Sequence, residues 1–186
     1  IFRLPKFAYY FYQSQRPPET ELSAPLESGP MVFIASYWNE DSPTGIKIFS
    51  NCEEVELALN GTIIGRQKPE IDPFSDHLAY PPFIFQVDVF EPGTFAATGY
   101  IDDLAVATHE VTTAGPPAQI RLEIDKSGIP ISENNPDVVF VYAHILDKNG
   151  NPVFTAIDEI EFSLEGDGEL IGRNPVAAEA GVASVL

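Results

Sequence analysis

The sequence has little of the chemistry that several specialised protein classes need. Among 186 residues it contains one cysteine, Cys52, one methionine, Met31, and one tryptophan, Trp38. A single cysteine excludes an intrachain disulfide and a thiolate metal cage. No apolar run approaches the roughly 20 residues that a membrane-spanning helix needs. We therefore expect neither a disulfide-stapled scaffold nor a membrane protein of the helical type.

Positive charge is also scarce. The chain has 10 Lys and Arg residues against 28 Asp and Glu residues, which gives a net charge of −18. Nucleic-acid binding needs a clustered cationic surface, and binding to anionic lipid needs a polybasic patch. We expect no nucleic-acid or membrane partner. Acidity of this size supports solubility and indicates no specific partner.

Proline and glycine, by contrast, are plentiful. Seventeen prolines and thirteen glycines separate short apolar runs, and 44% of the residues are hydrophobic. This pattern is typical of an all-β protein with many turns. The predicted fold class is mainly β, with two immunoglobulin-like β-sandwich domains, the second incomplete, after a short N-terminal helix.

An aromatic helix is predicted over residues 1–16, and Pro17 and Pro18 end it. It has apolar residues at helical spacing and three further tyrosines around them: Leu4, Phe7, Phe11, Tyr9, Tyr10 and Tyr12. A helix that is apolar on nearly every side is usually buried on several sides. We favour a partner outside this chain; the alternative is one amphipathic helix lying across a sheet face. Residues 19–30 are a linker rich in Pro, Ser and Glu.

The segment 31–114 predicts an immunoglobulin-like sandwich of about seven strands. The run EVELAL alternates cleanly over 54–59, and Asn60-Gly61 then predicts a tight hairpin. The loop 67–82 is long and stiffened by four prolines, which favours docking onto a neighbour. The predicted strands are 32–38, 46–50, 54–59, 62–66, 83–90, 94–101 and 104–111.

The last segment, 115–186, predicts a truncated sandwich. It offers about five strands, where such a domain usually has about seven. The chain begins at Ile1 without an initiator methionine and ends on an apolar strand. We therefore expect a piece cut from a longer protein at both ends. The predicted strands are 119–125, 138–147, 159–166, 168–172 and 182–186.

Carboxylate pairs are the first candidates for catalytic residues, and we expect none of them to be catalytic. They fall in turns or on outer strand faces, which indicates solvated surface. The pairs are Glu40-Asp41, Glu53-Glu54, Asp102-Asp103 and Asp158-Glu159.

Metal sites are not predicted either. Asp147, Asn149 and Asn151 imitate the start of a calcium loop, but Pro152 stands where that loop needs glycine, so a β-turn is expected. The histidines have no paired ligand spacing: they are His77, His109 and His144. We predict no catalytic residue, metal or cofactor.

Tyr37 and Trp38 are the candidate carbohydrate-binding residues. Sugar sites use aromatic faces beside polar groups, and Asn39 and Glu40 follow this pair directly. The alternative, which we favour, is that Trp38 fills the sandwich core. Tyr80 is a further aromatic candidate for the same role.

Several stretches resemble glycoside hydrolase family 2, the β-galactosidase group. IKIFSNCEEVELALNGTIIGRQKP (46–69) is similar to the immunoglobulin-like domain after its barrel, and FEPGTFAATGYIDDLAVATHEVTTAGPPAQIRLEID (90–125) to the end of that domain and the start of the next. KFAYYFYQSQ (6–15) resembles the last helix of the (β/α)₈ catalytic barrel. The stretch from DKNGNPV (147–153) onward resembles a bacterial immunoglobulin-like repeat.

The resemblance implies a domain order. Residues 1–18 would be the barrel's last helix, 19–30 a linker, 31–114 the first sandwich and 115–186 the truncated second one. The family's two catalytic glutamates lie at barrel strand ends, so no residue of this chain inherits their roles.

The resemblance also implies a role and a partner. The chain would be a non-catalytic C-terminal piece that supports the catalytic barrel of its own polypeptide, in the periplasm or at the cell surface, with an oligomer possible. The alternatives are a carbohydrate-binding module and a segment of a surface adhesin.

Overall fold

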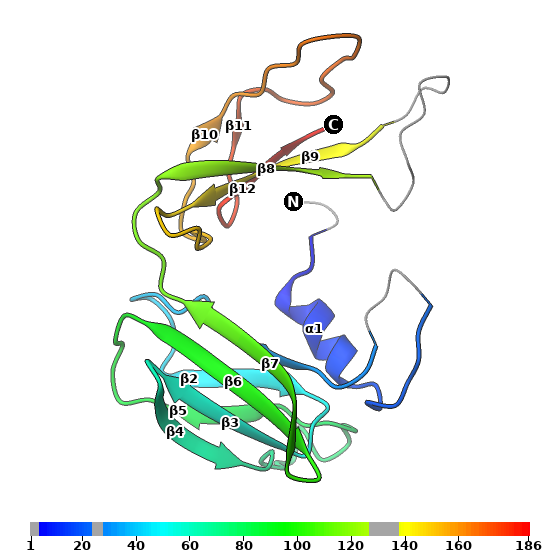
Figure 1. Cartoon of the computed structure of the whole chain (residues 1–186), viewed down its shortest axis with the longest axis vertical. Coiled ribbons are helices and arrows are strands. Elements are labelled where there is room, and N and C mark those ends of the chain that lie inside the picture. Colours follow the sequence, from blue (N-terminus) through cyan, green and yellow to red (C-terminus); the bar gives the residue numbers. More distant parts are fainter. Residues whose placement is uncertain (1–3, 24–27, 127–137) are drawn as a thin grey trace. The chain divides into compact units, whose positions relative to one another are not determined.

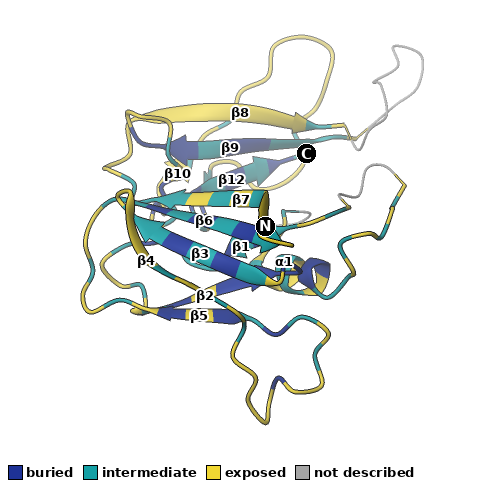
Figure 2. Cartoon of the chain, turned by 60° about the horizontal axis from the view of Figure 1, so that its bottom comes forward, coloured by how far each residue is buried: buried dark blue, intermediate teal, exposed yellow. Residues whose placement is uncertain are grey.

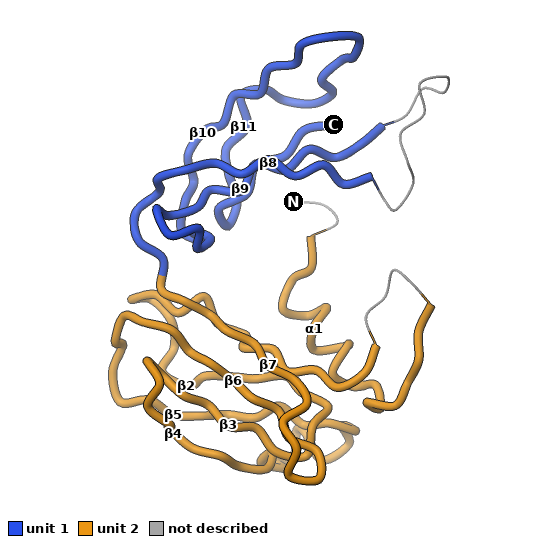
Figure 3. Tube along the Cα trace, in the orientation of Figure 1, with its two compact units in different colours: residues 1–3, 114–186 blue, residues 4–113 orange. Residues whose placement is uncertain are grey.

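The chain forms two compact units, shown in different colours in Figure 3. The computed structural model describes residues 4–23, 28–126 and 138–186. One unit is Leu4–Thr113; the other comprises Ala114–Leu186. The first three residues of the predicted helix and part of the predicted linker therefore lie outside the described residues.

The N-terminal helix is shorter than predicted. Helix α1 spans Phe7–Ser14, with Lys6 as its N-cap residue (Figure 1). Pro5 therefore precedes the helix, and Gln15 is its C-cap residue. Within the described ranges, no helix is long and apolar enough to cross a membrane.

Seven strands of the first unit make two antiparallel sheets. One sheet has the order β1-β2-β5 and the other β4-β3-β6-β7. Their bounds are β1 Val32–Ile34, β2 Gly45–Ser50, β3 Glu54–Leu59, β4 Thr62–Gln67, β5 Phe83–Gln86, β6 Thr94–Ile101 and β7 Leu104–Thr112.

Local sequence explains the most regular part of these sheets. Strand β3 has the predicted bounds, and Val55 and Leu57 on its alternating inner face are fully buried. Asn60 and Gly61 have φ values of 51° and 79°, as a two-residue hairpin turn requires. The predicted β3–β4 hairpin is confirmed. Strands β1 and β5 stop earlier than predicted, at Ile34 and Gln86.

The core of this unit is shared by both sheets. Every strand except β4 and β7 contributes fully buried side chains, and Figure 2 shows these inner positions as dark blue bands. The members are Val32, Ile34, Trp38, Ile46, Ile48, Val55, Leu57, Phe83, Phe85, Phe95 and Ala97. The observed architecture is mainly β; its immunoglobulin-like character stays a prediction.

The second unit has less regular structure than predicted. A three-stranded antiparallel sheet has the order β12-β9-β8, and β10 pairs with β11. The predicted strand 159–166 survives only as its first two residues, and 168–172 forms no strand, although Ile171 exchanges backbone hydrogen bonds with Leu186. The bounds are β8 Gln119–Asp125, β9 Phe140–Leu146, β10 Glu159–Ile160, β11 Val176–Ala177 and β12 Val182–Val185.

The main hydrophobic cluster of the second unit is made largely of small side chains, and Tyr142, Leu146 and Val185 are buried outside it. Four of its six buried members are alanines, beside Ile145 and Val153. On the edge strand β8, Ile120 and Leu122 pair with Ile145 and Ala143 of β9, yet they are 54% and 64% exposed. The buried apolar layer therefore does not extend under β8.

Candidate functional site: a pocket beside the N-terminal helix

Helix α1 packs on its own unit through one face. Tyr10 stacks on Phe33 with ring centroids 3.6 Å apart, and Phe11 lies edge-on to Phe49 at 5.5 Å. On the other side Tyr12 is 72% exposed and Tyr9 is 38% exposed. The expectation that the helix has no partner in this chain is wrong for its inner face, since the alternative of a helix lying on a sheet describes that face.

Asn51 forms hydrogen bonds with the chain that follows helix α1 and with the chain that leads into β1. It lies in the corner between β2 and β3 and is 3% exposed. Its Nδ2 donates to the carbonyl oxygens of Arg16 at 3.0 Å and Gly29 at 3.1 Å, and its Oδ1 accepts from the Met31 N–H at 2.7 Å. One side chain thus fixes the chain on both sides of the predicted linker.

Gln15 fixes the long loop 67–82 in the same region. Its Nε2 donates to the Tyr80 carbonyl at 2.7 Å, and its Oε1 accepts from the Tyr80 N–H at 3.2 Å. A side-chain amide therefore pairs with the backbone of Tyr80 as a neighbouring strand would. Because both bonds use backbone atoms of Tyr80, they leave its ring free to project.

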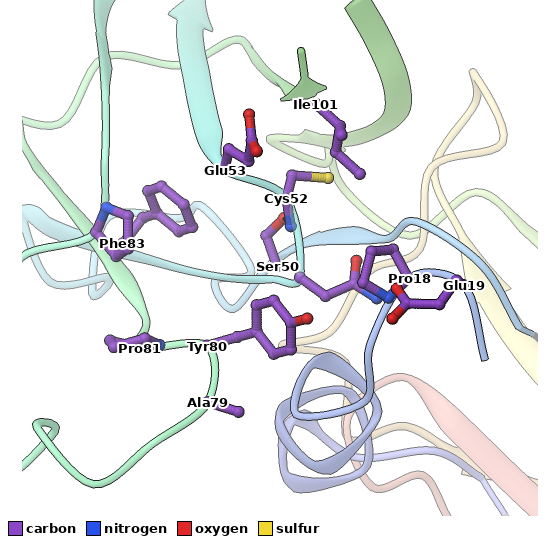
Figure 4. Close-up of a pocket in the computed structure, with 12 residues that line it drawn as sticks. Pro18, Glu19, Ser50, Cys52, Glu53, Ala79, Tyr80, Pro81, Phe83 and Ile101 are labelled. Atoms are coloured by element: carbon purple, nitrogen blue, oxygen red, sulfur yellow. The ribbon is translucent and has the colours of Figure 1, made fainter.

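A pocket of about 340 Å³ lies where these segments meet. Figure 4 shows Tyr80 with its hydroxyl directed toward Pro18 and Glu19, and Cys52 and Glu53 on the β2–β3 corner. The pocket is lined by Pro18, Glu19, Ser50, Asn51, Cys52, Glu53, Pro69, Ala79, Tyr80, Pro81, Phe83 and Ile101. Its volume is within the range of about 300–1,000 Å³ that is usual for small-ligand sites.

The electrostatics of the pocket are negative. Burial, and next the charge of Glu19, raise the pKa of the Tyr80 phenol. Burial first, with a smaller contribution from Glu53, raises the pKa of the Cys52 thiol, against hydrogen bonds to Ser50 and Met31. Both groups are therefore neutral at pH 7, and Glu19 and Glu53 carry the charge.

Cys52 is a packed side chain rather than a nucleophile. Its Sγ occupies the space beside Gly99, where an added Cβ would come within 2.6 Å of the sulfur. A thiol that is buried and protonated is unreactive. The glycine at position 99 is therefore explained by the close approach of the cysteine.

Of the predicted carbohydrate-binding residues, Tyr80 lines this pocket, whereas Tyr37 and Trp38 do not. Trp38 is fully buried and packs on Phe90 and Phe95, and its indole N–H donates to the Glu91 carbonyl at 2.9 Å. Tyr37 is 39% exposed and contacts Phe7. Trp38 thus fills the core, as the favoured alternative expects. Carbohydrate binding by Tyr37 and Trp38 stays a prediction.

Asp147 of the calcium-like stretch is an internal acceptor. Its Oδ1 accepts from the N–H groups of Asn149 at 2.8 Å and Asn151 at 2.9 Å; its Oδ2 accepts from the Gly115 N–H at 2.9 Å and the Asn151 amide at 3.0 Å. The Gly150 N–H donates to the Asp147 carbonyl, so the predicted β-turn is confirmed.

The other candidate groups remain dispersed. Arg66 bonds Glu54 at 2.7 Å and Asp103 at 2.6 Å on the surface, and Glu40, Asp41, Asp158 and Glu159 are exposed. His109 accepts from the Ile34 N–H at 3.2 Å, His144 lies 3.1 Å from a Glu123 oxygen, and His77 is exposed. Across residues 4–23, 28–126 and 138–186, no group of three or more His, Cys, Asp or Glu side chains is placed to hold a metal ion.

The sequence offers Tyr80 as a candidate aromatic residue, but no local pattern in it predicts the pocket. Glu19 lay in a predicted linker and Glu53 in a solvated pair. The connection between them depends on Gln15 and Tyr80, which are 65 positions apart. The one local signal was the length of loop 67–82, which indicates a functional or docking segment.

Comparisons with known proteins give the two units a family. Residues 41–107 match a domain of unknown function, DUF4982, and residues 120–181 match the glycoside hydrolase family 2 C-terminal domain 5. A β-galactosidase of Thermoanaerobacter pseudethanolicus is 37% identical over 198 residues, and the β-galactosidase BoGH2A of Bacteroides ovatus is 30% identical over 181. These alignments cover 100% and 94% of this chain, but 25% and 19% of the two relatives.

A solved structure shows the same fold. A β-glycosidase from Bacteroides vulgatus superposes with a TM-score of 0.77 at 24% identity, covering 98% of this chain and 23% of that one. The architecture and the matches define a class of antiparallel β domains. Residues 41–107 and 120–181 correspond to C-terminal domains of glycoside hydrolase family 2 enzymes, the β-galactosidase and β-glucuronidase group. The chain spans between about a fifth and a quarter of the length of the two curated β-galactosidase relatives.

Proposed function

We propose that this chain is structural support for the catalytic domain of a family 2 glycoside hydrolase that cleaves terminal β-glycosides. The observation that carries the proposal is the outer face of helix α1, where Tyr12 is 72% and Tyr9 is 38% exposed while the inner face is packed. Contiguous exposed aromatic surface marks an interaction site. The Thermoanaerobacter pseudethanolicus relative is about four times as long as this chain. Its additional residues would provide the partner for that surface.

The loop 67–82 offers a second apolar element. Phe74 is 85% and Ile71 is 71% exposed. The Asp72 carboxylate accepts from the Phe74 N–H and the Ser75 hydroxyl, both at 2.8 Å, and Gln15 holds the loop at Tyr80. A loop that is fixed internally and presents apolar side chains suits docking better than a mobile lid.

The finer assignments belong to the same proposal. The units would be immunoglobulin-like domains over 31–114 and 115–186, the helix within 1–18 would be the last helix of the catalytic barrel, and 19–30 would be a linker. The parent enzyme would act in the periplasm or at the cell surface, as a monomer or oligomer. The isolated chain would hydrolyse no glycoside.

A chimera tests the support role. This chain would replace the region that it matches in the Thermoanaerobacter pseudethanolicus β-galactosidase, and hydrolysis of a chromogenic β-galactoside and the melting temperature would be measured. We expect an active chimera, an inactive isolated chain, and a chimera with Tyr9→Asp and Tyr12→Asp that melts at a lower temperature.

The matched control is Val89→Asp, which places the same charge on an apolar residue that is 69% exposed and outside the helix and loop. This control should leave the chimera's melting temperature unchanged. Equal melting of the tyrosine variant and the control, or turnover by the isolated chain, would contradict the support role.

A further inference from the structure

The pocket beside Tyr80 carries negative charge that the chain itself does not neutralise. Among the described residues that line it, Glu19 and Glu53 are acidic and none is Lys, Arg or His. Within the described part of the chain neither carboxylate forms an ion pair, and Glu53 accepts one backbone hydrogen bond, from the Asp102 N–H at 3.1 Å. Both glutamates are exposed to solvent, and their uncompensated charge favours a cation in the pocket.

The remaining walls are aromatic and apolar. Tyr80 and Phe83 supply rings, and Pro18, Pro81 and Ile101 supply apolar surface. A compact, strongly hydrated cation gains little from such walls. A guanidinium group is planar and weakly hydrated; it stacks on aromatic faces and binds carboxylates through paired N–H donors. The combination of rings and carboxylates fits this cation.

The hydrogen-bonding groups of the pocket point to the same ligand. Ser50 and Cys52 direct their donors to the Met31 carbonyl, and Asn51 uses its amide on Arg16 and Gly29. What remains for a ligand is the carboxylate oxygens and the Tyr80 phenol. A pocket that offers mainly acceptors selects a ligand rich in donors, and guanidinium carries five N–H donors.

We propose that this pocket binds the guanidinium group of an arginine side chain presented by another polypeptide segment. Glu19 and Glu53 supply the charge and Tyr80 the stacking face. The proposal does not depend on the support role, because it concerns a site formed entirely by residues of the unit Leu4–Thr113.

A titration followed by NMR tests the ligand class on the intact chain. The probes are N-acetyl-arginine methylamide, its neutral isostere N-acetyl-citrulline methylamide, and agmatine as a free guanidinium. We expect saturable shifts of the Tyr80 ring and the Ile101 methyl signals with the arginine amide, weakening as salt is added. Equal binding of the citrulline amide, or no saturation with the arginine amide, would overturn the proposal. Binding of agmatine alone would restrict the site to free small guanidinium compounds and overturn the arginine assignment.

Matched variants locate the binding. Glu19→Gln and Glu53→Gln should each weaken it by about threefold, as expected for an exposed ion pair, and the double variant should abolish saturation. Glutamine at position 53 keeps an oxygen that can accept from the Asp102 N–H. Tyr80→Leu should also weaken binding while keeping the backbone bonds to Gln15. Glu40→Gln, an exposed carboxylate outside the pocket, is the control. Unchanged affinity in a folded double variant would refute the site.

Discussion

At the scale of single residues, side-chain amides and carboxylates form hydrogen bonds with backbone groups that strand pairing would satisfy elsewhere. Asn51 satisfies two carbonyl oxygens and one N–H of the irregular segments around it. Asp147 accepts four hydrogen bonds within its turn and from Gly115. Buried backbone groups without partners are costly, so these residues allow non-repetitive chain to be buried.

Asp147 gives the second unit a definite dependence on pH. The hydrogen bond from the Gly115 N–H, followed by those from Asn151 and Asn149, holds the pKa of its carboxyl far below the ordinary value. A carboxyl whose pKa is lowered by folding stabilises the fold above its unfolded pKa of about 3.9, and this contribution is lost as the pH falls toward the folded value. Asp147→Asn should therefore lower the free energy of unfolding at pH 7, and its difference from the parent should shrink below about pH 3.9.

Urea unfolding followed by far-UV circular dichroism at several pH values measures this difference. Asp167→Asn, at an exposed position of the same unit, is the control and should behave as the parent at every pH. A difference for Asp147→Asn that stays constant from pH 7 to pH 3 would contradict the account.

At the scale of elements, helix α1 has two faces with different tasks. Phe11 packs on Phe49, whereas Tyr12, the next residue, is 72% exposed. Successive helical positions point about 100° apart, so neighbouring aromatic residues separate onto a packed and an open side.

Substituting these two neighbours separates the tasks. Phe11→Ala should lower the free energy of unfolding by about 1–2 kcal/mol, less than the roughly 3–5 kcal/mol of a fully buried phenylalanine, because Phe11 is partly exposed. Tyr12→Ala should change it by no more than about 0.5 kcal/mol. Urea titrations followed by Trp38 fluorescence report on this unit. A Tyr12→Ala loss as large as that of Phe11→Ala would show that the outer face is packed after all.

The elements that the sequence predicts well are those that local forces determine. Strand β3 alternates strictly and Asn60-Gly61 adopts positive φ, so both are encoded within eight residues. The predicted strand 159–166 also alternates, but only Glu159 and Ile160 pair with another strand, at 176–177, which has no pattern of its own. An alternating pattern makes a strand possible, but the strand forms only where a segment distant in the sequence pairs with it.

The pocket lies beyond local prediction for the same reason. Its walls come from four separate segments, and the bonds that bring them together run between side chains and distant backbone, as between Gln15 and Tyr80. The hydrophobic periodicity of the sequence cannot predict such a contact. The sequence did supply the residues, the long loop and the aromatic helix, and the family resemblance is confirmed by the matches over 41–107 and 120–181.

At the scale of the whole molecule, the two units differ in the quality of their cores. The core of Leu4–Thr113 includes fully buried Trp38, Phe83 and Phe95. The main cluster of Ala114–Leu186 is mostly alanine, with Tyr142 and Leu146 buried outside it. Strand β8 of this unit leaves Ile120, Leu122 and Ile124 at least half exposed. Since hydrophobic stabilisation grows with the apolar area buried, the second unit gains less from folding.

The chain should therefore unfold in urea in two steps. Trp38 is the sole tryptophan and lies in the first unit, so fluorescence reports on that unit alone, whereas far-UV circular dichroism reports on both. We expect an early step in circular dichroism, from the second unit, that is silent in fluorescence, and a later step seen by both probes. Coincident single transitions would show that the units unfold as one.

The packing of Cys52 against Gly99 makes the alkylation rate of this thiol a measure of local unfolding. Alkylating reagents attack the thiolate, and the only thiol of the chain is both covered and held protonated by burial. Iodoacetamide added to the native protein would modify it only during moments when the first unit opens. The rate of that single modification would thus report how often the corner between β2 and β3 opens, without an engineered probe.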